Sequence, residues 1–174
     1  MTGKWEAGLK YLFPLFAFAL GVLIAEQIQH KYKYAKRLHW RQGILGAEII
    51  ILFIVGFIPQ RGNMIATVLV SFACAMQVQS FRKVNGFSYA STMCIGNLRS
   101  GTAALSFYLR ERRPEQLRQA MYYLGIIVLF AIGAGIGGNL SANYGIHMIW
   151  VSCGLLIVSF LLMFLDIEAR RSRA

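Results

Sequence analysis

Long apolar runs separated by short basic stretches dominate this chain. Five runs are long and apolar enough to predict membrane-crossing helices, at residues 11–28, 43–58, 63–81, 120–140 and 146–167. Most charged residues lie between the runs or at the two ends. A bilayer demands this segregation because unpaired charge in hydrocarbon is costly. The pattern therefore predicts an all-α, polytopic membrane helical bundle.

The stretch between the third and fourth runs is ambiguous. Residues 84–109 are rich in Gly, Ser and Thr and carry Arg99 near the middle, which is too polar for a clear spanning helix. If this stretch dips into the membrane and returns, all the basic segments fall on one side, as the positive-inside rule requires. We therefore favour about five transmembrane helices plus a re-entrant or broken-helix segment near 84–109. A sixth crossing stays open.

The same charge pattern predicts location and orientation. The basic segments at 31–41, 82–83 and 110–118 and the C-terminal arginines would face the cytoplasm, so the C-terminus would be cytoplasmic. We expect residues 1–174 to form a single transmembrane domain of a multi-pass protein in the bacterial inner (plasma) membrane.

Composition agrees with this picture and limits the partners. Hydrophobic residues make up 57% of the chain, charged residues 14%, and the mean hydropathy is +0.53. The net charge of +11 comes from basic residues at the ends of apolar runs. A nucleic-acid binder usually carries them on a polar face with aromatics interleaved. The expected partners are therefore the lipid bilayer, with anionic lipids at the basic loops, and no nucleic acid. A homo-oligomer stays open.

The reactive side chains indicate neither an enzyme nor a metal site. Cys74, Cys94 and Cys153 each lie inside an apolar stretch, without CxxC or His-Cys spacing. The three histidines are far apart, and the only aspartate is Asp166, at the end of the last run. No nucleophile stands near a base in the sequence. We expect no enzyme activity, no cofactor and no metal.

Glu48 is the most informative single residue. It lies five residues into the second apolar run, about 8 Å along a helix. An acid at such a depth favours a functional role, because it can bind a cation or carry a proton. The alternative is a structural partner for Ser, Thr or Arg99 on a neighbouring helix, or a side chain that reaches back to the interface.

The polar stretch at residues 84–109, called the polar arm below, is the second candidate. Its small and hydroxylated residues permit backbone turns whose freed carbonyl and amide groups can meet a substrate, as in the broken helices of transporters. Arg99 would favour an anion there. With Glu48, the residues of this substrate or ion path are Ser91, Thr92, Gly96, Asn97 and Arg99. The alternative is that these small residues only pack the arm between helices.

An internal similarity links the first and fourth runs. Residues 11–28 align without gaps on 123–140, with six identities. By the charge-based topology the two helices run in opposite directions, which is typical of an inverted repeat. Each carries a small-xxx-small motif that favours close helix packing, Gly21 with Ala25 and Gly133 with Gly137.

A resemblance to a known family rests on the residues after the third run. Ala75–Gly86 (AMQVQSFRKVNG) followed by Ser91–Leu98 (STMCIGNL) resembles the pattern of the YoaK-like bacterial membrane family, which has a domain of unknown function. Met1-Thr2-Gly3 matches part of a second element of that family, with Lys4 in place of Asn. Family members usually carry a further segment before it, so the resemblance implies a chain shortened at its N-terminus.

These features together predict a transporter or a channel-like protein for a small solute or ion. The alternative is a non-transporting membrane scaffold or accessory subunit with a basic cytoplasmic face.

Overall fold

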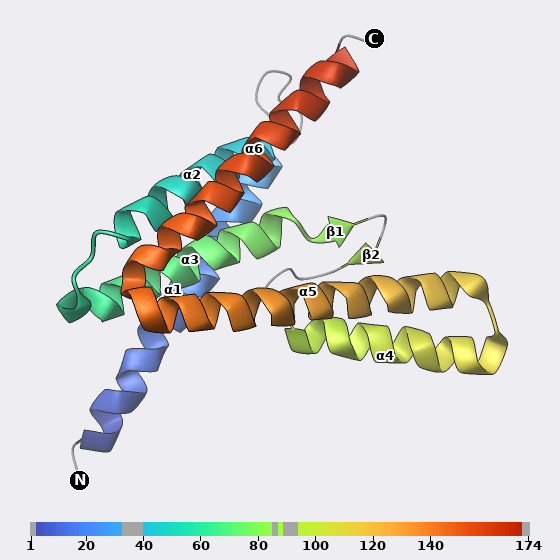
Figure 1. The fold of residues 1–174 in the computed structure, drawn as a ribbon, viewed down its shortest axis with the longest axis horizontal. Coiled ribbons are helices and arrows are strands. Elements are labelled where there is room, and N and C mark those ends of the chain that lie inside the picture. The colour runs from blue at the N-terminus through green and yellow to red at the C-terminus, as the bar shows by residue number, and fades with distance from the viewer. Residues whose placement is uncertain (1–2, 33–39, 85–86, 89–93, 172–174) are drawn as a thin grey trace. The chain divides into compact units, whose positions relative to one another are not determined.

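The computed structural model describes residues 3–32, 40–84, 87–88 and 94–171, which form six α-helices, two short 3₁₀ helices and one β-hairpin (Figure 1). The predicted all-α helical bundle is confirmed, and the hairpin is an addition to it. In order, the elements are α1 (Gly3–Tyr32), α2 (Trp40–Val55), η1 (Gln60–Gly62), α3 (Asn63–Ser80), β1 (Lys83–Val84), β2 (Phe87–Ser88), α4 (Cys94–Glu111), α5 (Pro114–Tyr144), η2 (Gly145–Met148) and α6 (Ile149–Arg171).

The chain divides into two compact units. The first comprises Met1–Ser80 with Tyr144–Ala174 and holds α1, α2, α3 and α6. The second comprises Phe81–Asn143 and holds the hairpin, α4 and α5. The expectation that residues 1–174 form one transmembrane domain stays a prediction.

Three segments of the described chain are long and apolar enough to cross a membrane, namely Lys10–Tyr32, Gln60–Ser80 and Pro114–Leu165. The third contains α5, η2 and most of α6. The short α2, with 16 residues, would be about 24 Å long, somewhat less than the hydrocarbon core. The chain is thus a membrane protein, and the count of about five crossings stays a prediction.

Several helices extend beyond the apolar runs that predict them. α1 begins at Gly3, and α6 continues to Arg171. The flanking Lys, Glu, Gln and Arg residues are good helix formers, so the backbone helix continues where the apolar run stops. α5 continues to Tyr144, beyond its apolar run at 120–140, and stops before Gly145, whose φ of +70° glycine tolerates well. An apolar run therefore marks the expected membrane core, not the helix end.

α2 ends earlier than its apolar run. Its helix stops at Val55, and the next residues form tighter turns in which the N–H groups of Phe57 and Ile58 donate to carbonyls three residues back. Pro59 explains this end, because proline has no N–H for the Val55 carbonyl four residues back and its ring clashes with that carbonyl in an α-helix.

In the first unit, α1 and α3 run parallel and in close contact. Ala17, Gly21 and Ala25 lie one turn apart on the buried face of α1. A Cβ at Gly21 would lie 2.6 Å from the carbonyl oxygen of Phe72 and 2.8 Å from the Cβ of Ala75. Small side chains on α1 thus allow the backbones of the two helices to approach closely.

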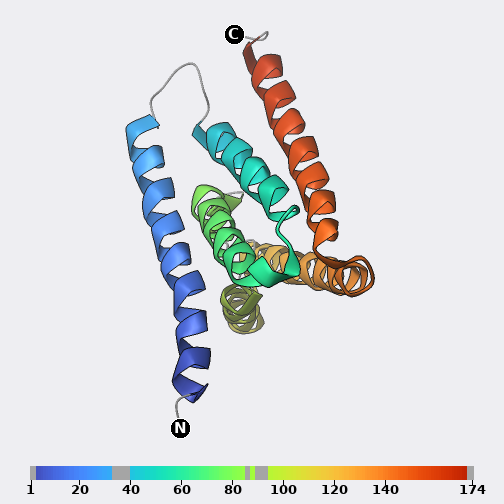
Figure 2. The same cartoon turned by 90° about the vertical axis from the view of Figure 1, so that its left-hand side faces the viewer.

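α2 contacts both α3 and α6, and Figure 2 shows it between α1 and α6. It is antiparallel to α6. The indole Nε1 of Trp150 donates to the Phe53 carbonyl at 3.4 Å, and one turn further along, Cys153 packs against Leu52 and Ala73. These contacts join α2 to α3 and α6.

In the second unit, α4 and α5 form an antiparallel hairpin (Figure 1). A Cβ at Gly101 of α4 would lie 3.0 Å from the Cβ of Tyr123 of α5. The turn between the helices places Arg112 at φ 53°, and the Arg112 N–H donates to the Tyr108 carbonyl at 2.8 Å. The preceding β1 and β2 pair antiparallel, with Lys83 opposite Ser88.

Candidate functional site

Glu48 lies inside the first unit, at a cavity of about 350 Å³ that α2, α3 and α6 line together. Its side chain is only 3% exposed. Its Oε2 has no hydrogen-bond partner among the residues that the structure describes. The carboxyl therefore keeps an acceptor free beside a space that a ligand can enter.

The other polar groups at this cavity come from two different helices. α3 contributes Cys74 and Gln77, which lie one helical turn apart and so share a face. α6 contributes Ser152. With Glu48 from α2, one carboxyl, one amide, one thiol and one hydroxyl meet where three helices converge. The wall between them is aliphatic and consists of Leu52, Val70, Ile149, Leu155 and Leu156.

A second polar contact joins α1 to α3 near the C-terminal ends of both helices. The amide of Gln79 donates to a carboxylate oxygen of Glu26. Next to it, the buried Ser80 donates back to the Met76 carbonyl at 2.7 Å. This pair is satisfied, so it stabilises the α1–α3 contact and leaves no vacant acceptor comparable with that of Glu48.

The predicted polar arm divides between described and undescribed residues. Ser91 and Thr92 lie outside the described part of the chain. Gly96 and Arg99 are exposed on α4, whereas Asn97 is buried on the face that also carries Gly101. Glu48 belongs to the first unit and these arm residues to the second. Their shared role in one path stays a prediction.

The two predicted packing motifs are in different surroundings. Gly21 and Ala25 are buried, and Gly21 meets α3. Gly133 and Gly137 of α5 are exposed, and apart from the neighbouring residues of α5 itself no described atom lies within 4 Å of where their Cβ atoms would be. Packing at the second motif stays a prediction.

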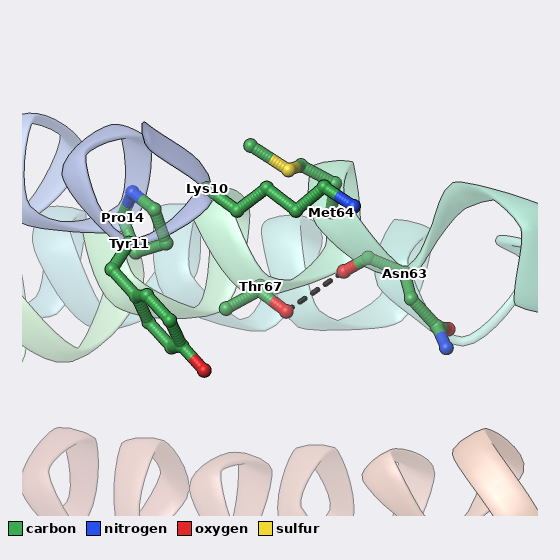
Figure 3. Close-up of a pocket in the computed structure, with 6 residues that line it drawn as sticks. All are labelled: Lys10, Tyr11, Pro14, Asn63, Met64 and Thr67. Carbon is green, nitrogen blue, oxygen red and sulfur yellow. Dashed lines mark hydrogen bonds between the residues drawn. The ribbon is translucent and has the colours of Figure 1, made fainter. Parts of the chain in front are cut away.

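A larger cavity of about 410 Å³ lies between the N-terminal parts of α1 and α3. Figure 3 shows its lining, in which the Lys10 side chain lies beside that of Met64 and the Thr67 hydroxyl donates to the Asn63 carbonyl at 2.7 Å. Its neighbour Tyr11 is 81% exposed. No buried, unpartnered polar atom of the described residues points to a ligand here, so the Glu48 cavity is the better candidate site.

Cys74, Gln77 and Ser152 were not predicted as neighbours of Glu48. A polar Gln77 inside an apolar run was a usable signal, and its spacing from Cys74 put both on one helix face. No sequence signal placed Ser152 beside them. The β-hairpin was also missed, although Asn85-Gly86 between its strands is a strong hairpin signal.

Residues 1–162 match the family model described as a protein of unknown function (DUF1275). The chain belongs to this family. The predicted membership in a family of unknown function is thereby confirmed. The match covers α1 to α5 and much of α6, and therefore every helix that lines the Glu48 cavity. No curated protein and no solved structure matches the chain.

Proposed function

We propose that this membrane protein is a transporter or a channel-like protein for a small solute or ion, and that Glu48 lies on its path. The observation that carries the proposal is the buried carboxyl of Glu48, whose Oε2 lacks a hydrogen-bond partner among the described residues, at a cavity between three helices.

A purely structural role accounts less well for Glu48. An unpaired acid inside a membrane helix is costly, and such residues are usually paired or mark a substrate or ion path. An aliphatic residue would pack against Leu52 and Leu156 without leaving a polar atom unpartnered. The carboxyl instead faces a cavity, where a cation or a proton can compensate its charge. We propose no catalytic role for Glu48.

We also propose that the protein lies in the bacterial inner membrane with its C-terminus in the cytoplasm. The arginines at the α4–α5 turn support this orientation, because Arg110, Arg112, Arg113 and Arg118 are all exposed and belong to one of the basic segments. This orientation depends on the re-entrant arm, which single cysteines at positions 87 and 143 test in intact cells. The two cysteines should be labelled from opposite sides of the membrane. Labelling of both from the same side would refute the re-entrant arm.

The experiment for transport uses the purified chain in proteoliposomes. A panel of cationic, anionic and neutral solutes is tested for uptake by wild type, Glu48→Gln and Glu115→Gln. Glu115 is a matched control, because it is exposed in the first turn of α5. Flux that Glu48→Gln abolishes and Glu115→Gln retains is expected. Absence of flux for every solute, or equal flux in both variants, would overturn the proposal.

A second candidate function is a scaffold whose basic face holds anionic lipid. The exposed arginines of the α4–α5 turn favour it, since each basic residue near an anionic surface contributes about 1 kcal/mol. If it is correct, Arg112→Gln with Arg118→Gln lowers the retention of anionic lipid through purification, and added salt weakens the retention in wild type. Unchanged retention contradicts it.

We further propose that α1 and α5 are related as an inverted repeat. The support is the gapless match of residues 11–28 to 123–140 and the similar length of the two helices, 30 and 31 residues. Opposite orientations of the two helices in the membrane, measured by the accessibility of cysteines at their ends, are expected. The same orientation would refute the relationship.

A further inference from the structure

The Glu48 cavity has the size and the mixed lining of a small-molecule site. Its volume of about 350 Å³ lies at the lower end of the range for ligand pockets. Such pockets are mostly apolar, with a few polar groups that fix the orientation of the ligand. This cavity has that composition, with its polar groups on α2, α3 and α6 and an aliphatic wall between them.

The polar groups favour a ligand that carries positive charge and donates hydrogen bonds. Glu48 supplies a carboxyl, Gln77 an amide oxygen and Ser152 a hydroxyl oxygen, and each can accept a hydrogen bond. None of the described lining residues is Lys, Arg or His. Among the described lining residues a charged Glu48 therefore has no cation to compensate it, and a bound cation would do so.

The same lining disfavours a bare metal cation. Ca²⁺ takes six to eight oxygen ligands, and Mg²⁺ requires near-octahedral oxygen coordination. The cavity offers few oxygen-bearing side chains and five aliphatic ones. No group of three or more metal-ligating side chains occurs in the described chain. A dehydrated metal ion would therefore lack ligands over most of the wall.

The type of organic cation also follows from the lining. Quaternary ammonium groups are typically held by aromatic cages, and no aromatic ring is among the described lining residues. A primary ammonium has three N–H donors at one end, equal in number to the three acceptor side chains Glu48, Gln77 and Ser152. A short hydrocarbon body would contact the aliphatic wall.

We infer that the Glu48 cavity binds a small primary aliphatic amine in its protonated form. The ammonium group pairs with Glu48 and donates to Gln77 and Ser152, and the alkyl chain packs against Leu52, Ile149 and Leu156. This inference rests on the proposed function, because it names the solute class for the same site.

The test measures binding to the purified full-length chain by the shift in its thermal unfolding. Three probes are cations added as chloride salts: n-butylammonium, tetramethylammonium and potassium. The fourth is n-butanol, the uncharged counterpart of n-butylammonium. Only n-butylammonium is expected to stabilise wild type. Its apparent Kd should rise by at least about tenfold in Glu48→Gln, because removing one partner of a buried charge pair weakens binding strongly. Glu115→Gln should bind as wild type does.

Alkylation of Cys74 gives a second readout at the same cavity. With Cys94→Ser and Cys153→Ala in place, Cys74 is the thiol that remains in the chain. N-ethylmaleimide should modify it more slowly when n-butylammonium is present, and Glu48→Gln should remove this protection. If Glu48→Gln does not fold, Ser152→Ala replaces it, since Ser152 is exposed at the cavity rim. A severalfold weaker affinity is then expected.

Several outcomes overturn the inference. These are no stabilisation by n-butylammonium, equal stabilisation by n-butanol, stronger stabilisation by potassium or tetramethylammonium, or an unchanged affinity in both cavity variants. Failure of this inference can be distinguished from failure of the proposed function. Amine binding without flux of any solute refutes transport alone, whereas flux of other solutes without amine binding refutes the amine site alone.

Discussion

Gly21 lies where α1 and α3 approach each other closely, so its replacement by valine tests the packing of the first unit directly. The added Cβ would lie 2.6 Å from the Phe72 carbonyl oxygen and 2.8 Å from the Ala75 Cβ, whereas ordinary contacts begin near 3.4 Å. The carbonyl belongs to helical backbone and cannot rotate away. The two helices must therefore separate locally by roughly 1 Å, which opens gaps on both sides of the contact.

The size of the effect follows from two opposing terms. Overpacking a tight contact typically destabilises by about 1–3 kcal/mol. Valine recovers a few tenths of a kcal/mol of helix propensity relative to glycine. For a chain of this length the net change corresponds to an apparent Tm lower by about 2–10 °C. The hydrogen bond from Gln79 to Glu26 lies along the same contact, so it should break more often in the variant.

In the assay the protein is heated in detergent, and the fraction that stays monodisperse is measured at each temperature. Gly154→Val in α6 is the matched control, because no described atom beyond the neighbouring residues of α6 lies within 4 Å of its Cβ position. This control should change the apparent Tm by less than about 2 °C. If Gly21→Val behaves as the control does, the close approach of α1 to α3 is refuted.

Two further predictions concern single contacts between helices of the first unit. Ser71→Ala removes the hydroxyl that donates to a backbone carbonyl of α1 at 2.7 Å, and should destabilise by about 0.6 kcal/mol, as membrane interhelical hydrogen bonds do. Thr67→Ala, which loses a bond only within its own helix, is the control, and equal effects of the two would contradict the interhelical role. Gly56→Ala places a Cβ against the indole of Trp150, so the emission of Trp150 should shift in a background with the other tryptophans replaced by phenylalanine. Gly46→Ala has open space at its Cβ, and a Gly56→Ala spectrum identical to that of Gly46→Ala would show that the ring does not sit there.

The sequence predicted the class of the fold because the bilayer acts on each segment separately. The apolar runs at 11–28 and 63–81 identify helices by length and composition alone, and the structure has α1 and α3 over these residues. Glu48 was identified in the same way, since an acid inside an apolar run is conspicuous without knowledge of its neighbours.

The helix ends and the hairpin were harder to predict from the sequence. Local signals set them, such as Pro59 after α2 and the positive φ at Gly145 after α5, and these compete with the apolar pattern. The run at 43–58 continues past the end of α2 because hydrophobicity reports burial in lipid or protein, and not backbone conformation.

What only the tertiary structure decided is which helix faces meet. Lipid and protein interiors are similarly apolar, so a membrane helix that is hydrophobic all round does not reveal which side contacts protein. Gly21 and Gly133 carry the same kind of motif in sequence, yet only the first meets another helix among the described residues. Likewise, Glu48 was evident from the sequence, but its cavity was not. Gln77 and Ser152 come beside it only through the packing of α2 with α3 and α6, at positions far apart along the chain.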